Sequence, residues 1–304
     1  MTTANETRTF DGNAEAIETW NGVLFDKFYR FRHIICDGLA VVGTAALARH
    51  PPSSGTRVLD VGCGFGDSTC EIAERIGAEG EAVGVDAAAR FIEVAREAAA
   101  AAGVRNAHFR VADAQFDDLG GPYDRVFSRF GTMFFVNPVA ALRNVRRALK
   151  DGGTFTMTVW RKKEDNPWLS DVERAVKDIV PLPPSTDQVT CGPGPFSMVS
   201  ADLVSAQLLA AGFDDVIFER FDTPIRIGDT IPDAIEFAMA LGPAGELIRL
   251  AGEEGARRRP EVVAALEKIL AAFVHPDGIY GQASTWIVTA RANERAATSQ
   301  TVFE

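Results

Sequence analysis

Residues that would mark a metal centre or a disulfide scaffold are scarce in this sequence. Four cysteines and four histidines occur among 304 residues. No Cys-x-x-Cys pair is present, and the histidines are scattered (His33, His50, His108 and His275). No metal site is therefore predicted. The thiols are expected to be separate and reduced, as in a cytosolic protein, at Cys36, Cys63, Cys70 and Cys191.

Long apolar runs are also missing. The longest, near Leu39–Ala48, is about half the length that a bilayer requires, so no membrane insertion is expected. Residues Met1–Asn13 are polar and acidic and do not resemble the basic and apolar regions of a signal peptide. The expected compartment is therefore the cytoplasm.

Positive charge is in deficit. There are 31 Lys and Arg against 42 Asp and Glu, which gives a net charge of −11. Such a surface repels phosphate backbones, so no nucleic-acid partner is expected. Apolar residues make up 46% of the chain, enough for a sizeable core. The sequence leaves the oligomeric state open between monomer and homodimer.

The first half of the chain carries helical and then alternating patterns. Residues 14–50 place Ile17, Trp20, Leu24, Phe28 and Phe31 at helical spacing. From Arg57, short β-rich runs alternate with helical ones. Strands are predicted at 57–61, 82–86, 108–112, 123–128 and 154–160, with helices at 68–76, 88–102 and 139–149. This alternation predicts parallel pairing and a doubly wound α/β sheet.

After Trp160 the alternation is interrupted by a proline-rich stretch around one predicted helix, Leu169–Val180. It resumes with a helix at 201–211, a strand at 216–221, helical segments over 232–273 and a last strand at 285–290. The predicted organisation is a helical cap (1–50), a core (51–160), a lid insertion with a helix (161–215), a C-terminal part of the sheet with a helical insertion (216–293) and a tail (294–304).

The strongest local signal is the turn Asp60-Val-Gly-Cys-Gly-Phe-Gly66 after the first predicted strand. Glycines there allow a sharp turn and close approach of a ligand, and the following helix offers free N–H groups. A dinucleotide motif would need glycine at Asp67, and Asp60 would repel a pyrophosphate. Instead, Asp60 can face the ammonium of S-adenosylmethionine while N–H groups hold its carboxylate. The alternative interpretation is that this glycine turn binds no ligand.

Two further acids follow later strands. Asp86 ends the second strand, 20 residues after Gly66, where a carboxylate can accept both ribose hydroxyls. Asp113 and Ala114 follow the third strand, where a carboxylate and a backbone N–H can read adenine. Each acid alone could instead be an ordinary helix cap or turn residue. Together they lie at the sheet edge where open α/β folds bind ligands.

The order VLDVGCGFGDST, VGVD, VADAQF, YDRVFSRFG and LKDGGTFTMTVW resembles class I S-adenosylmethionine-dependent methyltransferases, in particular the UbiE-like small-molecule group. The resemblance covers about 57–160 and implies a seven-stranded Rossmann-like, mostly parallel sheet whose last strand, WIVTARA, is antiparallel. It implies S-adenosyl-L-methionine as cofactor and S-adenosyl-L-homocysteine as product. The cofactor residues implied by the motifs and their neighbours are Trp20, Asp60, Gly62, Cys63, Gly64, Gly66, Asp86, Ala87, Asp113, Ala114, Ser128, Arg129 and Phe130.

The acceptor is less well specified. A small, aromatic or lipophilic molecule is expected, methylated on oxygen, carbon or nitrogen by in-line displacement driven by orientation and desolvation. His33 is the candidate base, His275 a weaker one, and Arg129 could pair with an acceptor carboxylate. Candidate pocket residues are Tyr29, Met133, Trp160, Trp168, Phe196 and Met239. The alternatives are a nicotinamide oxidoreductase of related fold, for which no Tyr-x-x-x-Lys set is found, and a non-catalytic S-adenosylmethionine-binding module.

Overall fold

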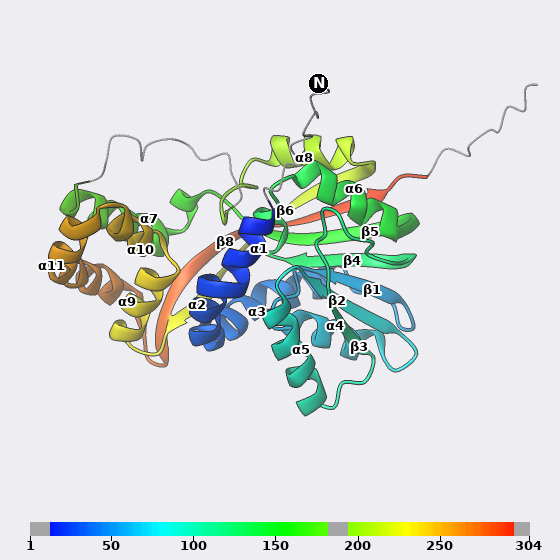
Figure 1. Ribbon diagram of the computed structural model, residues 1–304, viewed down its shortest axis with the longest axis horizontal. Coiled ribbons are helices and arrows are strands. Elements are labelled where there is room, and N and C mark those ends of the chain that lie inside the picture. Colours follow the sequence, from blue (N-terminus) through cyan, green and yellow to red (C-terminus); the bar gives the residue numbers. More distant parts are fainter. Residues whose placement is uncertain (1–12, 182–193, 295–304) are drawn as a thin grey trace, which may run out of the picture.

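In the computed structural model, which describes residues 13–181 and 194–294, one mixed sheet runs through the molecule (Figure 1). Its strand order is β3-β2-β1-β4-β5-β8-β6, and a short β7 pairs with β8. The bounds are β1 Arg57–Val61, β2 Glu81–Asp86, β3 Ala107–Val111, β4 Tyr123–Arg129, β5 Leu149–Trp160, β6 Phe213–Gly228, β7 Val274–His275 and β8 Gly278–Ala292. Cys191 and most of the predicted tail lie outside the described residues.

The pairing of the strands confirms the predicted fold class. The first five strands pair in parallel, and β8 runs antiparallel between β5 and β6. The strands of the parallel part are largely buried and apolar, as expected for strands covered on both faces. The sequence predicted the last two strands too short, because β6 and β8 continue as a pair beyond the part of β8 that β5 covers, Thr285–Arg291.

Helices cover both faces of the sheet, as a doubly wound fold requires (Figure 1). One face carries α3 (Arg32–Arg49), α4 (Asp67–Ile76) and α5 (Ala89–Ala101), and the other carries α6 (Pro138–Ala148) and α8 (Ala201–Ala210). The side chain of Asn137 caps α6 by accepting the N–H of Ala140, and Ser200 caps α8. These caps satisfy N–H groups that the first helical turn leaves without partners.

The N-terminal cap consists of α1 (Ala14–Thr19), the π-helical turn η1 (Trp20–Leu24) and α2 (Phe25–Arg30). Gly22 interrupts the helical geometry with φ −105° and ψ −113°. Among the described helices, none is by itself long and apolar enough to cross a bilayer. The pair Ala14–Arg30 and Arg32–Arg49 meets that test only when taken together, and its halves are bent by 83°.

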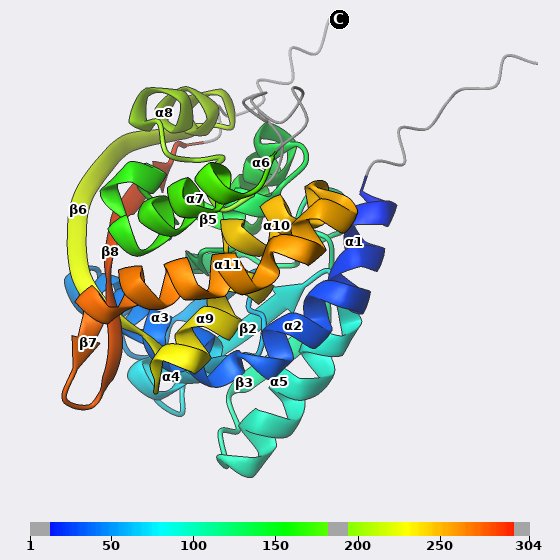
Figure 2. The same ribbon diagram turned by 90° about the vertical axis from the view of Figure 1, so that its left-hand side faces the viewer.

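Four helices from two parts of the chain form the lid. They are α7 (Pro167–Ile179), α9 (Ile231–Ala240), α10 (Pro243–Leu250) and α11 (Gly252–Leu270), which pack against one another beyond the sheet (Figure 2). Short turns η2 (Thr132–Phe134), η3 (Lys163–Asp165) and η5 (Ala271–Phe273) complete the structure. The predicted lid of 161–215 therefore divides, because α7 joins α9–α11 whereas α8 packs beside α6 on the sheet.

The lid meets the sheet over a glycine. A Cβ on Gly281 of β8 would lie 2.5 Å from the indole of Trp168 in α7, so no larger residue fits under this ring. Trp168 is buried there and stacks on Phe237 of α9, with ring centroids 6.3 Å apart. This contact fixes α7 and α9 over the extended β6–β8 pair.

Candidate functional site

The carboxyl ends of the central parallel strands open onto a cavity. Its volume is about 640 Å³, within the range of about 300–1,000 Å³ that is usual for cofactor and small-molecule sites. The cap, the turns after the strands and the lid all contribute to its wall. One space therefore connects the predicted cofactor turn with the predicted acceptor residues.

The turn between β1 and α4 lines this cavity through Gly62, Cys63 and Gly64. Gly62 and Gly64 have φ values of 69° and 52°, a left-handed conformation that glycine adopts without a steric cost. The N–H groups of Gly62 and Cys63 donate to the carbonyl oxygen of Val85 at 2.8 and 3.0 Å. The turn is thus tied to β2, and it lies where the sequence predicted the cofactor.

Asp60 belongs to the same motif but does not line the cavity. It is 1% exposed, and its Oδ2 accepts hydrogen bonds from the hydroxyls of Ser68 and Thr69, both at 2.7 Å. Burial raises the pKa of its carboxyl to about 6. This buried position disagrees with the predicted direct contact with an ammonium. Asp60 instead stabilises the start of α4 through these two hydrogen bonds, away from the cavity.

Gly66 also differs from its predicted role. Gly66 does not line the cavity. A Cβ there would lie 2.7 Å from the Phe109 ring and 2.8 Å from Ala95 Cβ, so this glycine permits close packing of the turn on β3 and α5.

Asp86 ends β2 and holds the glycine turn from its other side. Its Oδ2 accepts the N–H of Gly64 at 3.1 Å, and its Oδ1 accepts the N–H of Ala88 at 3.0 Å. Burial raises the pKa of this carboxyl, and the two N–H contacts oppose that shift. Each carboxylate oxygen keeps a further lone pair for a ligand hydroxyl. Asp86 and Ala87 both line the cavity.

The loop after β3 contributes Asp113, Ala114 and Gln115 to the cavity wall. Oδ1 of Asp113 accepts the backbone N–H of Gln115 at 2.9 Å, and Oδ2 accepts the side-chain amide of Asn13. The amide of Asn144 donates to the carbonyl oxygen of Ala114 at 2.9 Å. The loop is therefore fixed by α6 on one side and contacted by the N-terminal cap on the other.

The end of β4 and the loop that follows contain three predicted cofactor residues with different contacts: Ser128, Arg129 and Phe130. Ser128 is fully buried and donates to the carbonyl oxygen of Val61 at 2.7 Å, behind the cavity wall. Phe130 lines the cavity with φ 57°, a backbone conformation that non-glycine residues rarely adopt. Its ring stacks on Trp160 with centroids 4.8 Å apart, which holds the side chain in place.

Arg129 forms an ion pair with Asp67, with 2.6 Å between NH2 and Oδ2. Burial alone would lower the pKa of Arg129, but Asp67 outweighs it and raises that pKa. Beside the pair, burial raises the pKa of the Cys36 thiol to about 12, with Asp67 adding to the shift. The suggested pairing of Arg129 with an acceptor carboxylate is corrected, since its charge is neutralised within the protein.

The cap covers the cofactor side of the cavity through Trp20. Its ring contacts Phe134 and Phe28 edge to face, with centroids 4.9 and 5.1 Å apart. Asn21 binds α5, because its Oδ1 accepts the backbone N–H of Arg90 at 3.2 Å and its carbonyl oxygen accepts the Arg90 guanidinium at 3.0 Å. Trp20 therefore lies over the site on a segment that is anchored at the next residue.

Tyr29 and His33 do not line the cavity. Tyr29 is 45% exposed and stacks on Phe25, while His33 is exposed near the start of α3. The chain turns between α2 and α3, which directs these positions away from the site. The candidate base and one candidate pocket residue are thus corrected, and none of the described residues that line the cavity is a histidine.

Aromatic and apolar side chains form the other half of the cavity. Four predicted pocket residues are among them: Met133, Trp160, Trp168 and Phe196. Met239 is not, because it packs within the lid against the core rather than on the cavity surface. His275 lies on the exposed β7, against Tyr280.

Several lining residues were not predicted from the sequence. Gly131 approaches the glycine turn so closely that a Cβ would lie 2.9 Å from the Val61 carbonyl oxygen and 3.1 Å from Gly62 Cα. Gly131 directly follows the predicted cofactor residues Ser128, Arg129 and Phe130, and this position could have identified it from the sequence. No comparable local signal marked further lining residues, among them Asn13, Ile35, Cys36, Leu39, Phe134, Phe135, Lys163 and Glu246.

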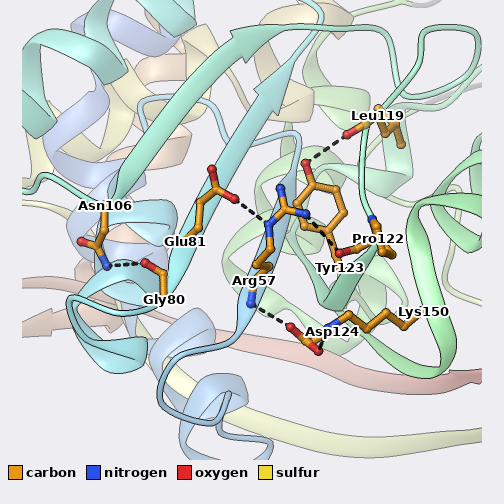
Figure 3. Close-up of polar contacts among 9 residues, drawn as sticks. All are labelled: Arg57, Gly80, Glu81, Asn106, Leu119, Pro122, Tyr123, Asp124 and Lys150. Carbon is orange, nitrogen blue, oxygen red and sulfur yellow. Dashed lines mark hydrogen bonds and ion pairs between the residues drawn. The ribbon is translucent and has the colours of Figure 1, made fainter.

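Polar groups at the opposite edge of the sheet are engaged with one another. Arg57 donates through Nε to Glu81 at 2.6 Å and through its backbone N–H to Asp124 at 2.9 Å (Figure 3). Lys150 also pairs with Asp124, and Tyr123 donates to the carbonyl oxygen of Leu119 at 3.1 Å. These contacts join the amino ends of β1, β2 and β4, so we interpret them as stabilising this edge of the sheet. Among the described residues, no cluster of His, Cys, Asp and Glu could hold a metal ion.

The methyltransferase domain family matches residues 52–182. Aklanonic acid methyltransferase DauC from Streptomyces sp. strain C5 is 36% identical over 113 residues, which cover 36% of this chain and 51% of that protein. Demethylmenaquinone methyltransferase from Staphylococcus aureus is 34% identical over 100 residues, covering 33% and 41%. The match thus spans about half the length of these relatives or less, and it confirms the resemblance to UbiE-like class I methyltransferases.

Solved structures share the fold of this chain. YcgJ from Bacillus subtilis has a TM-score of 0.53 at 17% identity, covering 85% of this chain and 99% of its own. The [4+2]-cyclase SpnF has a TM-score of 0.50 at 21% identity, covering 84% and 81%. At these identities the likeness concerns the fold alone.

Proposed function

We propose that the protein is an S-adenosylmethionine-dependent methyltransferase acting on a small, aromatic or lipophilic acceptor. The observation that carries this proposal is the division of one cavity into two chemically different halves. Gly62–Gly64, Asp86 and Asp113 supply backbone and carboxylate groups on one side, and stacked aromatic rings line the other. A cofactor and an apolar acceptor can meet in such a space.

The residues present suit this cofactor. The turn of Gly62 and Gly64 leaves backbone exposed to a ligand, and Asp86 retains acceptor capacity for two ribose hydroxyls. Asp113 and Gln115 lie farther along the same wall, beside the cap residue Asn13. When bound, the cofactor would supply an electrophilic methyl group on a sulfonium.

The contribution of this chain is then orientation and exclusion of water. Phe130 and Trp160 restrict the acceptor side, and Trp20 covers the cofactor side. Holding the reactants in line in this way can lower the activation barrier by roughly 7–11 kcal/mol. No described histidine lines the cavity, so we assign no role to a histidine base.

Calorimetric titration with S-adenosylmethionine, S-adenosylhomocysteine and NAD tests the proposal. We expect both methionine-derived ligands to bind and NAD to give no response, because Asp67 replaces the third glycine of a dinucleotide turn. Methyl transfer is then followed as formation of S-adenosylhomocysteine with a panel of aromatic acceptors. Binding of NAD in place of S-adenosylhomocysteine would favour the oxidoreductase alternative.

A second candidate is a binding module that holds the cofactor without transferring its methyl group. The fold alone does not decide between them, since SpnF is a cyclase with this fold. The aromatic half of the cavity favours an acceptor and hence an enzyme. S-adenosylhomocysteine binding without turnover on any aromatic acceptor would favour the module.

A further inference from the structure

Among the described residues, few charged groups line the aromatic half of the cavity, and two of them are paired with a neighbour of opposite charge. Arg129 is paired with Asp67 at 2.6 Å. Glu246 receives two hydrogen bonds from the exposed Arg249, one to each carboxylate oxygen, at 2.8 and 2.6 Å. The third charged residue that the described part of the chain contributes on this side is Lys163.

Lys163 shares its counter-charge with a second cation. It lies in η3, directly after β5, and its ammonium contacts Glu173 of α7. Glu173 also binds Lys177 at 3.1 Å, so one carboxylate serves two ammonium groups. Burial acts to raise the pKa of Glu173, but the two lysines outweigh it and lower that pKa. The group of three carries a net positive charge.

Only one of these two lysines reaches the cavity. Lys163 lines it and also lies over the ring of Phe196, with Nζ 5.7 Å from the ring centroid. Lys177 is one turn farther along α7 from Glu173 and does not line the cavity. Lys177 can therefore keep Glu173 compensated when Lys163 turns to a ligand.

Trp168 belongs to the same aromatic wall and is 5% exposed. Its indole Nε1 is itself buried and is not open to the cavity. Among the described residues of this wall, the Lys163 ammonium is therefore the group that calls for an oxygen acceptor from the ligand.

We propose that Lys163 binds an anionic oxygen of the methyl acceptor, so that the acceptor is an aromatic carboxylate. The ring would lie among Phe130, Trp160 and Trp168, and the carboxylate would meet the Lys163 ammonium. Ion pairing in a largely apolar pocket is stronger than in water. This inference rests on the proposed methyltransferase function, since it describes the acceptor half of that site.

The test compares naphthoate with its neutral analogue naphthamide, bound to the protein saturated with S-adenosylhomocysteine. Affinity is measured by calorimetry and by quenching of tryptophan fluorescence. We expect the wild-type protein to prefer naphthoate by about tenfold or more. Lys163→Met should remove this preference, and Lys163→Arg should retain most of it. Lys177→Met is the comparison variant, because Lys177 contacts the same Glu173 outside the cavity. It leaves Glu173 to Lys163 and should therefore lower the preference without abolishing it.

The outcomes separate this inference from the proposed function. Equal binding of the two probes, failure of naphthoate to bind, or a preference that survives Lys163→Met would each overturn the role of Lys163. S-adenosylhomocysteine binding is measured first and does not involve Lys163, so its absence would contradict the proposed function itself. Loss of the preference in Lys177→Met as well would assign the effect to Glu173 and also overturn the inference.

Discussion

Replacement of Asp86 by Asn is the sharpest test of the cofactor site. The carboxylate accepts one N–H on each oxygen, from Gly64 at 3.1 Å and from Ala88 at 3.0 Å. An amide can accept only one of the two and presents its own N–H groups to the other. One buried donor is then unsatisfied, which costs about 1–3 kcal/mol of folding free energy.

The same change weakens ligand binding separately. If Asp86 accepts the two ribose hydroxyls, Asn loses one charge-assisted hydrogen bond, worth about 1.5–3 kcal/mol. This corresponds to an increase of roughly 10–100-fold in the dissociation constant of S-adenosylhomocysteine. Calorimetry gives that constant, and chemical denaturation gives the free energy of unfolding for the same preparation.

Asp124→Asn provides the matched control. Asp124 also accepts a backbone N–H, from Arg57 at 2.9 Å, and pairs with Lys150, but it lies at the opposite edge of the sheet (Figure 3). It should lose stability without any change in S-adenosylhomocysteine binding. An unchanged dissociation constant in folded Asp86→Asn, or equal weakening in both variants, would refute the ribose assignment.

Three further predictions concern residues around the glycine turn. Gly131→Ala should lower the free energy of unfolding by about 1–3 kcal/mol and weaken S-adenosylhomocysteine binding, because its Cβ would meet backbone at 2.9 and 3.1 Å; Gly194→Ala, with open space around it, should change neither. Asp60→Asn should become progressively more stable relative to wild type as the pH rises from 3.8 to about 6. The raised folded-state pKa means that the native state binds the proton more tightly, so ionisation costs stability, at most roughly 3 kcal/mol; denaturation across this range checks it, and a constant difference would contradict it. Asp67→Asn should cost about 3 kcal/mol by leaving buried Arg129 unpaired, and adding Arg129→Met should restore part of that loss; a double variant less stable than the single one would argue against the pair.

The cofactor half could be predicted because its determinants are local in the sequence. Gly62 and Gly64 need left-handed backbone at a turn, and Asp86 and Asp113 follow strands that end at one edge. Asp60 and Gly66 share the motif, yet they act behind the turn. Their roles depend on Ser68, Thr69, Phe109 and Ala95, whose proximity arises only when β3, α4 and α5 pack.

The acceptor half could not be predicted to the same degree. Trp160 is the last residue of β5 and lines the cavity as expected, because the strand fixes the direction of its side chain. Three candidate residues lie on helices whose rotation is set by packing between the cap, the lid and the sheet: Tyr29, His33 and Met239. The chemical character of these side chains did not indicate which face of each helix points to the cavity. Lys163 carried no local signal in the sequence, because its contact with Glu173 arises only when η3 packs against α7.

The boundary between the two halves of the cavity has a consequence for how such proteins diversify. The cofactor wall from β1 to the loop after β4 lies within the matched methyltransferase domain, whereas Phe196, Phe237 and Glu246 lie beyond residue 182. The aromatic wall is therefore shared between the two stretches, because Phe130, Trp160 and Lys163 lie inside the matched range. Exchange of α9 and α10 would alter only the part of this wall that Phe237 and Glu246 supply, and it would leave the wall from β1 to the loop after β4 in place.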